Sequence, residues 1–218
     1  SGNEEWNQIF GGNENDRGYS VQQTTDGGYI MIGSTRSIGS GGNDAWLIKT
    51  DSNGNEEWNQ TFGGGNTDYG RSVQQTTDGG YIIIGATKSF GNGNYDYWLI
   101  KTDSLGNEEW SQTFGYANID RTQSGQQTTD GGYIMIGSTK SIQNGDYEAW
   151  LIKTDSNGDS LWTQKFGASE DDYCISVQQT TDGGYVFTGH TASFGNGNYD
   201  CWLLKTDSLG NEEWSQTF

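Results

Sequence analysis

Four aspartates stand at one position of a repeating pattern, 52 residues apart: Asp16, Asp68, Asp120 and Asp172. Each opens a predicted strand, and carboxylates gathered at the mouth of a central channel could hold a cation or a hydrated ligand. The same side chain can instead cap the turn into the strand by accepting backbone hydrogen bonds. We favour the capping role and keep the four aspartates as candidate ligand-binding residues.

Four glutamines follow on the same predicted strand, each the first of a Gln-Gln pair: Gln22, Gln74, Gln126 and Gln178. Side chains alternate between the two faces of a strand, so each pair sends one amide to either side. These amides could hydrogen-bond a sugar in the channel, or they could satisfy buried backbone groups between neighbouring sheets. Both roles stay open, and the four glutamines join the candidate ligand-binding set.

Two turns carry oxygen-bearing side chains at alternate positions, as calcium loops do: Asp51, Asn53 and Asn55, and Asp155, Asn157 and Asp159. The other two copies have Leu105 and Leu209 at the middle position, which removes that ligand. Asp, Asn and Gly also suit a hairpin turn, so we predict a turn and no metal site. The only histidine, His190, rules out a histidine-based metal cluster or catalytic triad. No catalytic residue and no cofactor are predicted.

Basic residues recur as well: Lys49, Lys101, Lys153 and Lys205 follow apolar residues of a third strand. Glutamates of the Glu57 type lie nearby, which predicts cross-strand ion pairs. Arg17 and Arg121 alternate with Tyr69 and Tyr173 at one position, where we expect a solvated edge. The loops at residues 91–96 and 195–200 combine Asn, Tyr and Asp beside a tryptophan, as both sugar-binding loops and ordinary polar turns do.

All these positions belong to a unit of 52 residues that occurs four times, over 11–62, 63–114, 115–166 and 167–218. Each unit reads as two hairpins, the first turning at an Asp-Gly-Gly and the second within segments such as 51–55. Four strands per unit and no helical periodicity predict an all-β fold, a β-propeller of four blades with four antiparallel strands each. Residues 1–10 repeat the last strand of the unit and are predicted to form one extra outer strand of a single domain over 1–218.

Tryptophans flank the second hairpin of every unit, as Trp46 and Trp58 do in the first. Hydrophobic residues make up only 30% of the chain, but these include nine Trp, twelve Tyr and eight Phe. Aromatic side chains bury more area than aliphatic ones. We therefore expect the tryptophans to wedge between neighbouring blades and supply the core.

The formal net charge is −18, which repels phosphate backbones and anionic lipids and makes nucleic acids and membrane surfaces poor partners. No apolar run is long enough to insert into a membrane. Cys174 and Cys201 fall on first-strand and third-strand segments, roughly 10 Å apart across the strand between them. That distance exceeds disulfide reach, so both are predicted to be free thiols.

The motifs TTDGGYI-I-G and WLIKTDS-x-GNEEW extend over the whole chain. With them the units resemble the tandem propeller repeats, kelch-like or quinoprotein-like, of large bacterial and archaeal surface or secreted proteins. The hairpin at residues 51–58 is similar to the tryptophan-docking turn of quinoprotein-type propellers and to the Asp-box of sialidases, although its spacing matches neither. The resemblance implies a propeller fold and an extracellular or cell-surface setting. Separately, the surplus copy of the outer strand leads us to expect that this chain is a fragment of a longer secreted protein.

A glycosidase needs two carboxylates in different environments, whereas a repeat offers equivalent ones. We therefore predict a non-enzymatic extracellular scaffold or binding module for protein or glycan contacts. Two alternatives stay open: a self-assembling structural repeat protein joined by exchange of outer strands, and a glycan-active hydrolase or lyase. Five copies of the outer strand serve four sets of the other three strands, so one terminal strand is expected to pack elsewhere or pair with another molecule.

Overall fold

A computed structural model of the chain describes residues 2–141 and 145–218. Within them all strands belong to four antiparallel sheets of four strands, and each sheet keeps the chain order of its strands. The first sheet holds β1 (Arg17–Gln23), β2 (Tyr29–Thr35), β3 (Asp44–Thr50) and β4 (Glu56–Phe62). The second holds β5 (Asp68–Gln75), β6 (Tyr81–Thr87), β7 (Asp96–Thr102) and β8 (Glu108–Phe114). The third holds β9 (Asp120–Gln127), β10 (Tyr133–Lys140), β11 (Tyr147–Thr154) and β12 (Ser160–Phe166). The fourth holds β13 (Asp172–Gln179), β14 (Tyr185–Thr191), β15 (Asp200–Thr206) and β16 (Glu212–Thr217).

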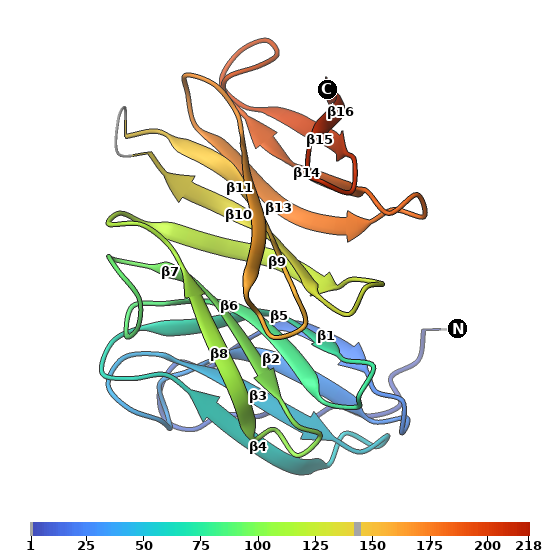
Figure 1. The fold of residues 1–218 in the computed structure, drawn as a ribbon. Helices are drawn as coiled ribbons and strands as arrows, with labels where there is room; N and C mark the ends of the chain where they lie inside the picture. The colour runs from blue at the N-terminus through green and yellow to red at the C-terminus, as the bar shows by residue number, and fades with distance from the viewer. Residues whose placement is uncertain (1, 142–144) are drawn as a thin grey trace.

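The sheets pack face to face in chain order, like the blades of a fan (Figure 1). The first strands of successive sheets contact one another along a common inner side: β1, β5, β9 and β13. This is the arrangement of four β-propeller blades that the repeat predicts. The first and fourth blades lie at opposite ends of the array (Figure 1).

Each blade contains two tight turns that account for the repeated Asp and Gly residues. In the first turn of blade one, Gly27 has a φ of 87°, and the Asp26 carboxylate accepts the Gly28 amide at 3.0 Å. In the second turn Gly54 has a φ of 79°, a left-handed conformation that favours glycine. The turn chemistry therefore sets where each strand begins and ends.

A lysine ties the two turns of each blade together. The buried Lys49 amine lies 2.9 Å from Asp26 and 2.8 Å from Glu57. The second and fourth blades repeat both contacts, of which the sequence predicts the ion pair with the glutamate. The third blade pairs Lys153 with Asp130 and has Leu161 in place of the glutamate.

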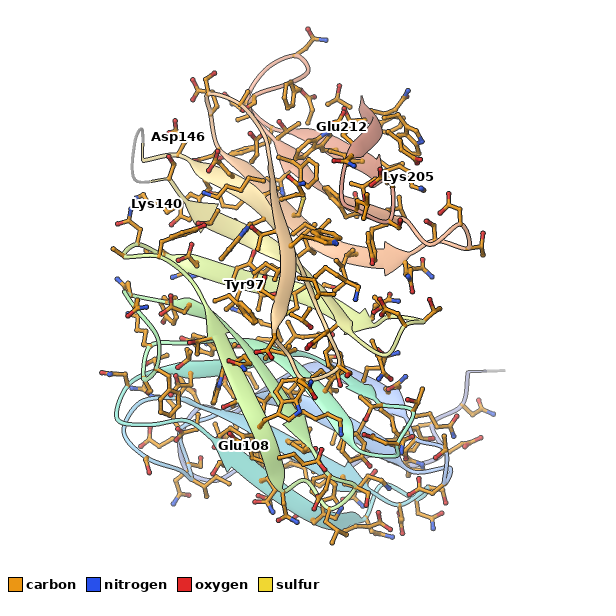
Figure 2. The ribbon with its side chains drawn as sticks, in the orientation of Figure 1. Tyr97, Glu108, Lys140, Asp146, Lys205 and Glu212 are labelled. Carbon is orange, nitrogen blue, oxygen red and sulfur yellow. The ribbon has the colours of Figure 1, made fainter. Side chains whose placement is uncertain are left out.

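The core consists of apolar layers between neighbouring blades. Every residue of β6 and β7 is buried, because these central strands are covered on both faces. Tyr97 lies in the middle of the molecule (Figure 2), where its hydroxyl donates to the Trp150 carbonyl at 3.1 Å. The predicted wedges are confirmed: each of three tryptophans meets a tyrosine of the next blade with ring centroids 5.8 Å apart, in the pairs Trp58–Tyr81, Trp110–Tyr133 and Trp162–Tyr185.

The predicted extra outer strand is wrong in its secondary structure. Residues 2–16 contain no strand, and residue 1 lies outside the described residues. A strand needs the backbone of a neighbouring strand, and no ladder forms along this segment. It lies against the face of the first blade instead, where the ring centroids of Trp6 and Tyr29 are 5.6 Å apart. The segment thus copies the aromatic contact of an outer strand without its hydrogen bonds.

Both cysteines are free, as predicted, with Cys174 buried and Cys201 exposed. In the described part of the chain there is no helix of the length and apolar character that a membrane crossing requires.

Candidate functional site

The four candidate aspartates lie where the inner strands begin, and their carboxylates bind the backbone and hydroxyls of their own blades. Fully buried Asp68 accepts hydrogen bonds from the Gly64 amide at 3.0 Å and from the Ser89 hydroxyl at 2.6 Å. Asp16 and Asp172 bind the equivalent serines, and Asp120 accepts the amide of Tyr116 at 2.7 Å. This is the geometry of turn caps, the role that we favoured from the sequence.

Two of the four candidate glutamines hold neighbouring blades together. The side-chain oxygen of Gln22 accepts the backbone amide of Gln75 at 2.7 Å, and that of Gln74 accepts the amide of Gln127 at 2.8 Å. Gln126 is half-buried and Gln178 is exposed. Of the two roles left open, the observed bonds of Gln22 and Gln74 match the structural one.

The two turns that resemble calcium loops use their carboxylates for the turn itself. Asp51 accepts the backbone amides of Asn53 and Asn55 at 2.8 and 2.9 Å. Across the described residues, no group of three or more His, Cys, Asp or Glu side chains is placed to hold a metal ion.

A pocket on the inner side of the first three blades gathers residues that the sequence analysis did not select. Its volume is about 170 Å³. The side chains that define this arginine–tyrosine pocket come from three blades: Arg17, Tyr19, Tyr69, Arg71, Tyr95 and Arg121. Three of the four arginines of the chain are therefore found in one small cavity.

A β-bulge in each inner strand positions two of these side chains. The register between β1 and β2 shifts between Gly18 and Ser20, so Tyr19 has no partner on the neighbouring strand. The same shift in the second blade makes Arg71 the extra residue. Bulges redirect a side chain and recur beside functional sites, and here they present Tyr19 and Arg71 to the pocket.

Arginine and tyrosine side chains alternate across the pocket. The guanidinium carbon of Arg71 lies 4.5 Å from the ring centroid of Tyr19 and 5.4 Å from that of Tyr69. Arg121 lies 4.7 Å from the centroid of Tyr95, whose ring stacks on Tyr69 at 6.0 Å. These cation–π contacts hold the guanidinium groups of Arg71 and Arg121 in place, and each guanidinium carries five N–H donors with which it can bind a ligand.

The positive charge of the pocket is not balanced by carboxylates. No Asp or Glu lines it, and the ion pairs seen among the described residues all use lysine. Three uncompensated guanidinium groups in a chain of net charge −18 favour an anionic ligand, because arginine binds carboxylates and phosphates through two parallel hydrogen bonds.

The tyrosines of the pocket differ in acidity. Burial raises the pKa of Tyr19, but hydrogen bonds with Ser34 and Arg17 and the charges of Arg71 and Arg17 lower it by more, so the net pKa falls below 10.0. In contrast, burial and the neighbouring Tyr69 raise the pKa of Tyr95 to about 12. Of these two tyrosines, Tyr19 is the more acidic phenol and therefore the one better suited to exchange a proton.

Arg17 and Arg121 are exposed, as expected of a solvated edge, but the inner strands also bring them together with half-buried Tyr69 around one pocket. One signal in the sequence could have found the pocket. The first unit has arginine at residue 17 and the second has tyrosine at the equivalent residue 69. Two residues later the types are exchanged, with Tyr19 in the first unit and Arg71 in the second. That reversal interleaves the two types across neighbouring blades.

No model of a known protein family matches the chain, and no curated protein does either. Among solved structures, a candidate exo-beta-1,3-galactanase from Bifidobacterium bifidum is similar over 93% of this chain and 73% of its own, with 16% identity and a TM-score of 0.53. A candidate glycoside hydrolase from Parabacteroides distasonis matches 93% of this chain and 73% of its own, at 13% identity and a TM-score of 0.49. An endo-1,5-alpha-L-arabinanase from Thermotoga petrophila matches 90% of this chain and 57% of its own, at 16% identity and a TM-score of 0.48.

The likeness to the galactanase supports a propeller-type repeat fold, but it does not support the kelch-like or quinoprotein-like family. It contradicts the prediction of a non-enzymatic scaffold or binding module, because that solved structure is described as a carbohydrate-cleaving enzyme. The alternative, a glycan-active hydrolase or lyase, remains as a proposal. At 16% identity the likeness establishes the fold alone, so any activity has to be argued from the residues of this chain.

Proposed function

We propose that this chain is a glycan-active enzyme whose arginine–tyrosine pocket binds an acidic sugar unit and cleaves its glycosidic bond by β-elimination. One observation carries the proposal: in a strongly acidic chain, three arginines without carboxylate partners line one pocket with Tyr19, and the Arg71 guanidinium lies over the Tyr19 ring.

The pocket supports a uronate as the bound unit. Its volume of about 170 Å³ is below that of pockets for larger ligands and suits a single sugar ring. The guanidinium groups offer bidentate hydrogen bonds to the carboxylate of the sugar. The tyrosine rings offer flat apolar surfaces for its C–H groups. A neutral sugar would leave the three positive charges without a counter-charge.

In a uronate, the hydrogen on C5 lies next to the carboxylate and becomes more acidic when cations neutralise that group. Tyr19, as the phenolate, takes this proton, and the electrons of the C5–H bond form a double bond between C4 and C5. The bond between C4 and the glycosidic oxygen then breaks, and the leaving oxygen takes the proton back from the Tyr19 phenol. The step balances without water or a cofactor.

Elimination is favoured over hydrolysis by the lining of the same pocket. Glycoside hydrolysis ordinarily uses a pair of Asp or Glu carboxylates on either side of the scissile bond. None lines this cavity, whereas the arginines and a tyrosine of lowered pKa meet the needs of elimination.

The test incubates the protein with polygalacturonate and alginate, and with galactan and arabinan as neutral controls. We expect ultraviolet absorbance from the new conjugated double bond with the acidic polymers alone. Tyr19→Phe should remove the absorbance and keep binding measured by calorimetry, and Arg71→Met should weaken binding about tenfold or more. Arg36→Met, at an exposed arginine outside the pocket, is the matched control. Release of reducing ends without absorbance would show hydrolysis instead, and no binding of any acidic glycan would remove the proposal.

A further inference from the structure

The outward face of the fourth blade lacks the cover that the other blades have. In the first blade five apolar positions of this face are buried against the second blade: Ile30, Ile32, Ala45, Leu47 and Phe62. The equivalent residues of the fourth blade are all half-buried or exposed: Val186, Thr188, Cys201, Leu203 and Phe218. Trp214, the counterpart of the wedge Trp58, is 44% exposed, and Phe218 is 72% exposed.

The inward face of the first blade carries the matching surface. The second blade uses five apolar residues of its inward face to pack against the first blade. The same five positions of the first blade also carry apolar residues: Val21, Tyr29, Met31, Trp46 and Ile48. Cover on this face is incomplete, since Val21 is 62% exposed whereas its counterpart Val73 is 5% exposed.

Residues 2–10 provide the partial cover of that face. Trp6 meets Tyr29, and Gly54 lies against the Trp6 ring as Gly106 lies against Trp58. Two cavities of about 160 and 420 Å³ remain beside Phe10 and Met31. The segment has no strand pairing, so it holds its place with fewer contacts than a complete blade would make.

We propose that the outward face of the fourth blade docks the first blade of a second copy of this chain, with β16 of one copy replacing residues 2–10 on the other. The contact continues an interface that the molecule already forms three times, in which a tryptophan of one blade meets a tyrosine of the next at 5.8 Å. Trp214 of one copy would pack against Tyr29 of the other copy in the same way. This assembly is independent of the proposed enzymatic function.

The interface is head-to-tail, because one copy contributes its fourth blade and the other its first. Such an interface makes a closed ring when the rotation closes and an open array when it does not. Two copies supply eight blades, which is within the range that propellers use. We therefore expect a dimer as the smallest assembly.

The experiment measures molar mass by light scattering over a range of concentrations, always with the full chain. Trp6→Ala combined with Phe10→Ala removes the two aromatic anchors of the cover and should shift association to roughly tenfold lower concentration. Trp214→Ala should abolish association in both the wild-type and the doubly substituted background. Leu105→Ala is the control, because Leu105 is a 63% exposed apolar residue on a turn of the second blade. It should change nothing.

Association of the doubly substituted chain that depends on Trp214 supports the proposal, whether or not the wild type remains monomeric. A doubly substituted chain that stays monomeric at the highest concentration, with a circular dichroism spectrum like the wild type, overturns it. Association that Trp214→Ala leaves unchanged overturns it as well, because the contact would then lie elsewhere.

Discussion

Buried carboxylates at the contacts between blades show how one neighbour changes the acidity of a residue. Burial and the charge of Asp120 raise the pKa of Asp96 to about 6, and burial and Asp68 raise the pKa of Asp44 in the same way. Gly115 leaves the space between Asp96 and Asp120 free, since a Cβ there would lie 1.6 Å from the Asp96 carboxylate. At the third contact the residue is Glu148, which pairs with Lys165 at 3.1 Å instead.

This arrangement predicts a pH dependence of stability. The pKa of Asp96 is raised from 3.8 to about 6, so the folded state binds more protons than the unfolded state between these values. The contribution of Asp96 to the free energy of unfolding is therefore full at low pH and falls as pH rises to about 6. Urea unfolding of the wild type and of Asp96→Asn across this window should show a flatter profile for the variant. Identical profiles would mean that Asp96 does not titrate in this way.

At the scale of the elements, the second hairpin of a blade combines a local turn with a contact from the preceding blade, and the first does not. Gly79 and Gly106 both have positive φ values, of 86° and 79°. A Cβ on Gly79 would meet nothing within 4 Å, whereas one on Gly106 would lie 2.6 Å from the Trp58 ring. The second turn of a blade is therefore a packing surface as well as a turn.

The two glycines separate backbone strain from packing. Gly79→Ala should cost about 1–2 kcal/mol through its left-handed backbone alone. Gly106→Ala should cost about 1 kcal/mol or more beyond that, because Trp58 has to move from its place between blades. Chemical denaturation of both variants measures the difference, and equal costs would show that the Trp58 ring adapts freely.

The lysines give a second test at this scale. Glu109 is about half exposed where it meets Lys101, so Glu109→Leu, which copies Leu161 of the third blade, should cost less than about 1 kcal/mol. Lys101→Ala should cost about 2 kcal/mol or more, because it removes a buried stem and leaves the Thr102 carbonyl without the amine at 2.8 Å. Thermal unfolding of the pair checks the order, and a larger loss for Glu109→Leu would contradict it.

At the scale of the whole molecule, each blade is stabilised by its immediate neighbours, as in other repeat proteins. Wedge tryptophans at equivalent positions therefore contribute different amounts to the free energy of unfolding, depending on whether another blade covers them. Trp58 packs into the layer between the first two blades, whereas Trp214 is 44% exposed on the fourth blade.

Trp58→Ala should destabilise the protein by about 2–4 kcal/mol, because it opens a cavity between two blades. Trp214→Ala in the monomer should cost less than about 1 kcal/mol, because its ring is 44% exposed and has no tyrosine partner. Denaturation at low protein concentration compares the two. Equal losses would mean that Trp214 is already covered in solution, as it would be in a tight dimer.

Most of the candidate site escaped prediction. The aspartates and glutamines were selected because they recur, but Asp68 and Gln22 recur for structural reasons: one caps a turn and the other joins two blades. Arg71 and Tyr19 each occur once at their positions, so a search for repeated residues passes over them. The bulges that present them are also not visible in a simple alternation of side chains.

The sequence by itself determined the strands, the turns and the blade. These depend on interactions within a few residues: glycines that allow positive φ, carboxylates that accept nearby amides, and apolar runs that must be covered on both faces. Only the tertiary structure decided that three arginines share one pocket, that residues 2–10 cover a face without forming a strand, and that the outward face of the fourth blade stays open. Those features depend on how whole sheets pack against one another, and no pattern within a single 52-residue unit records that geometry.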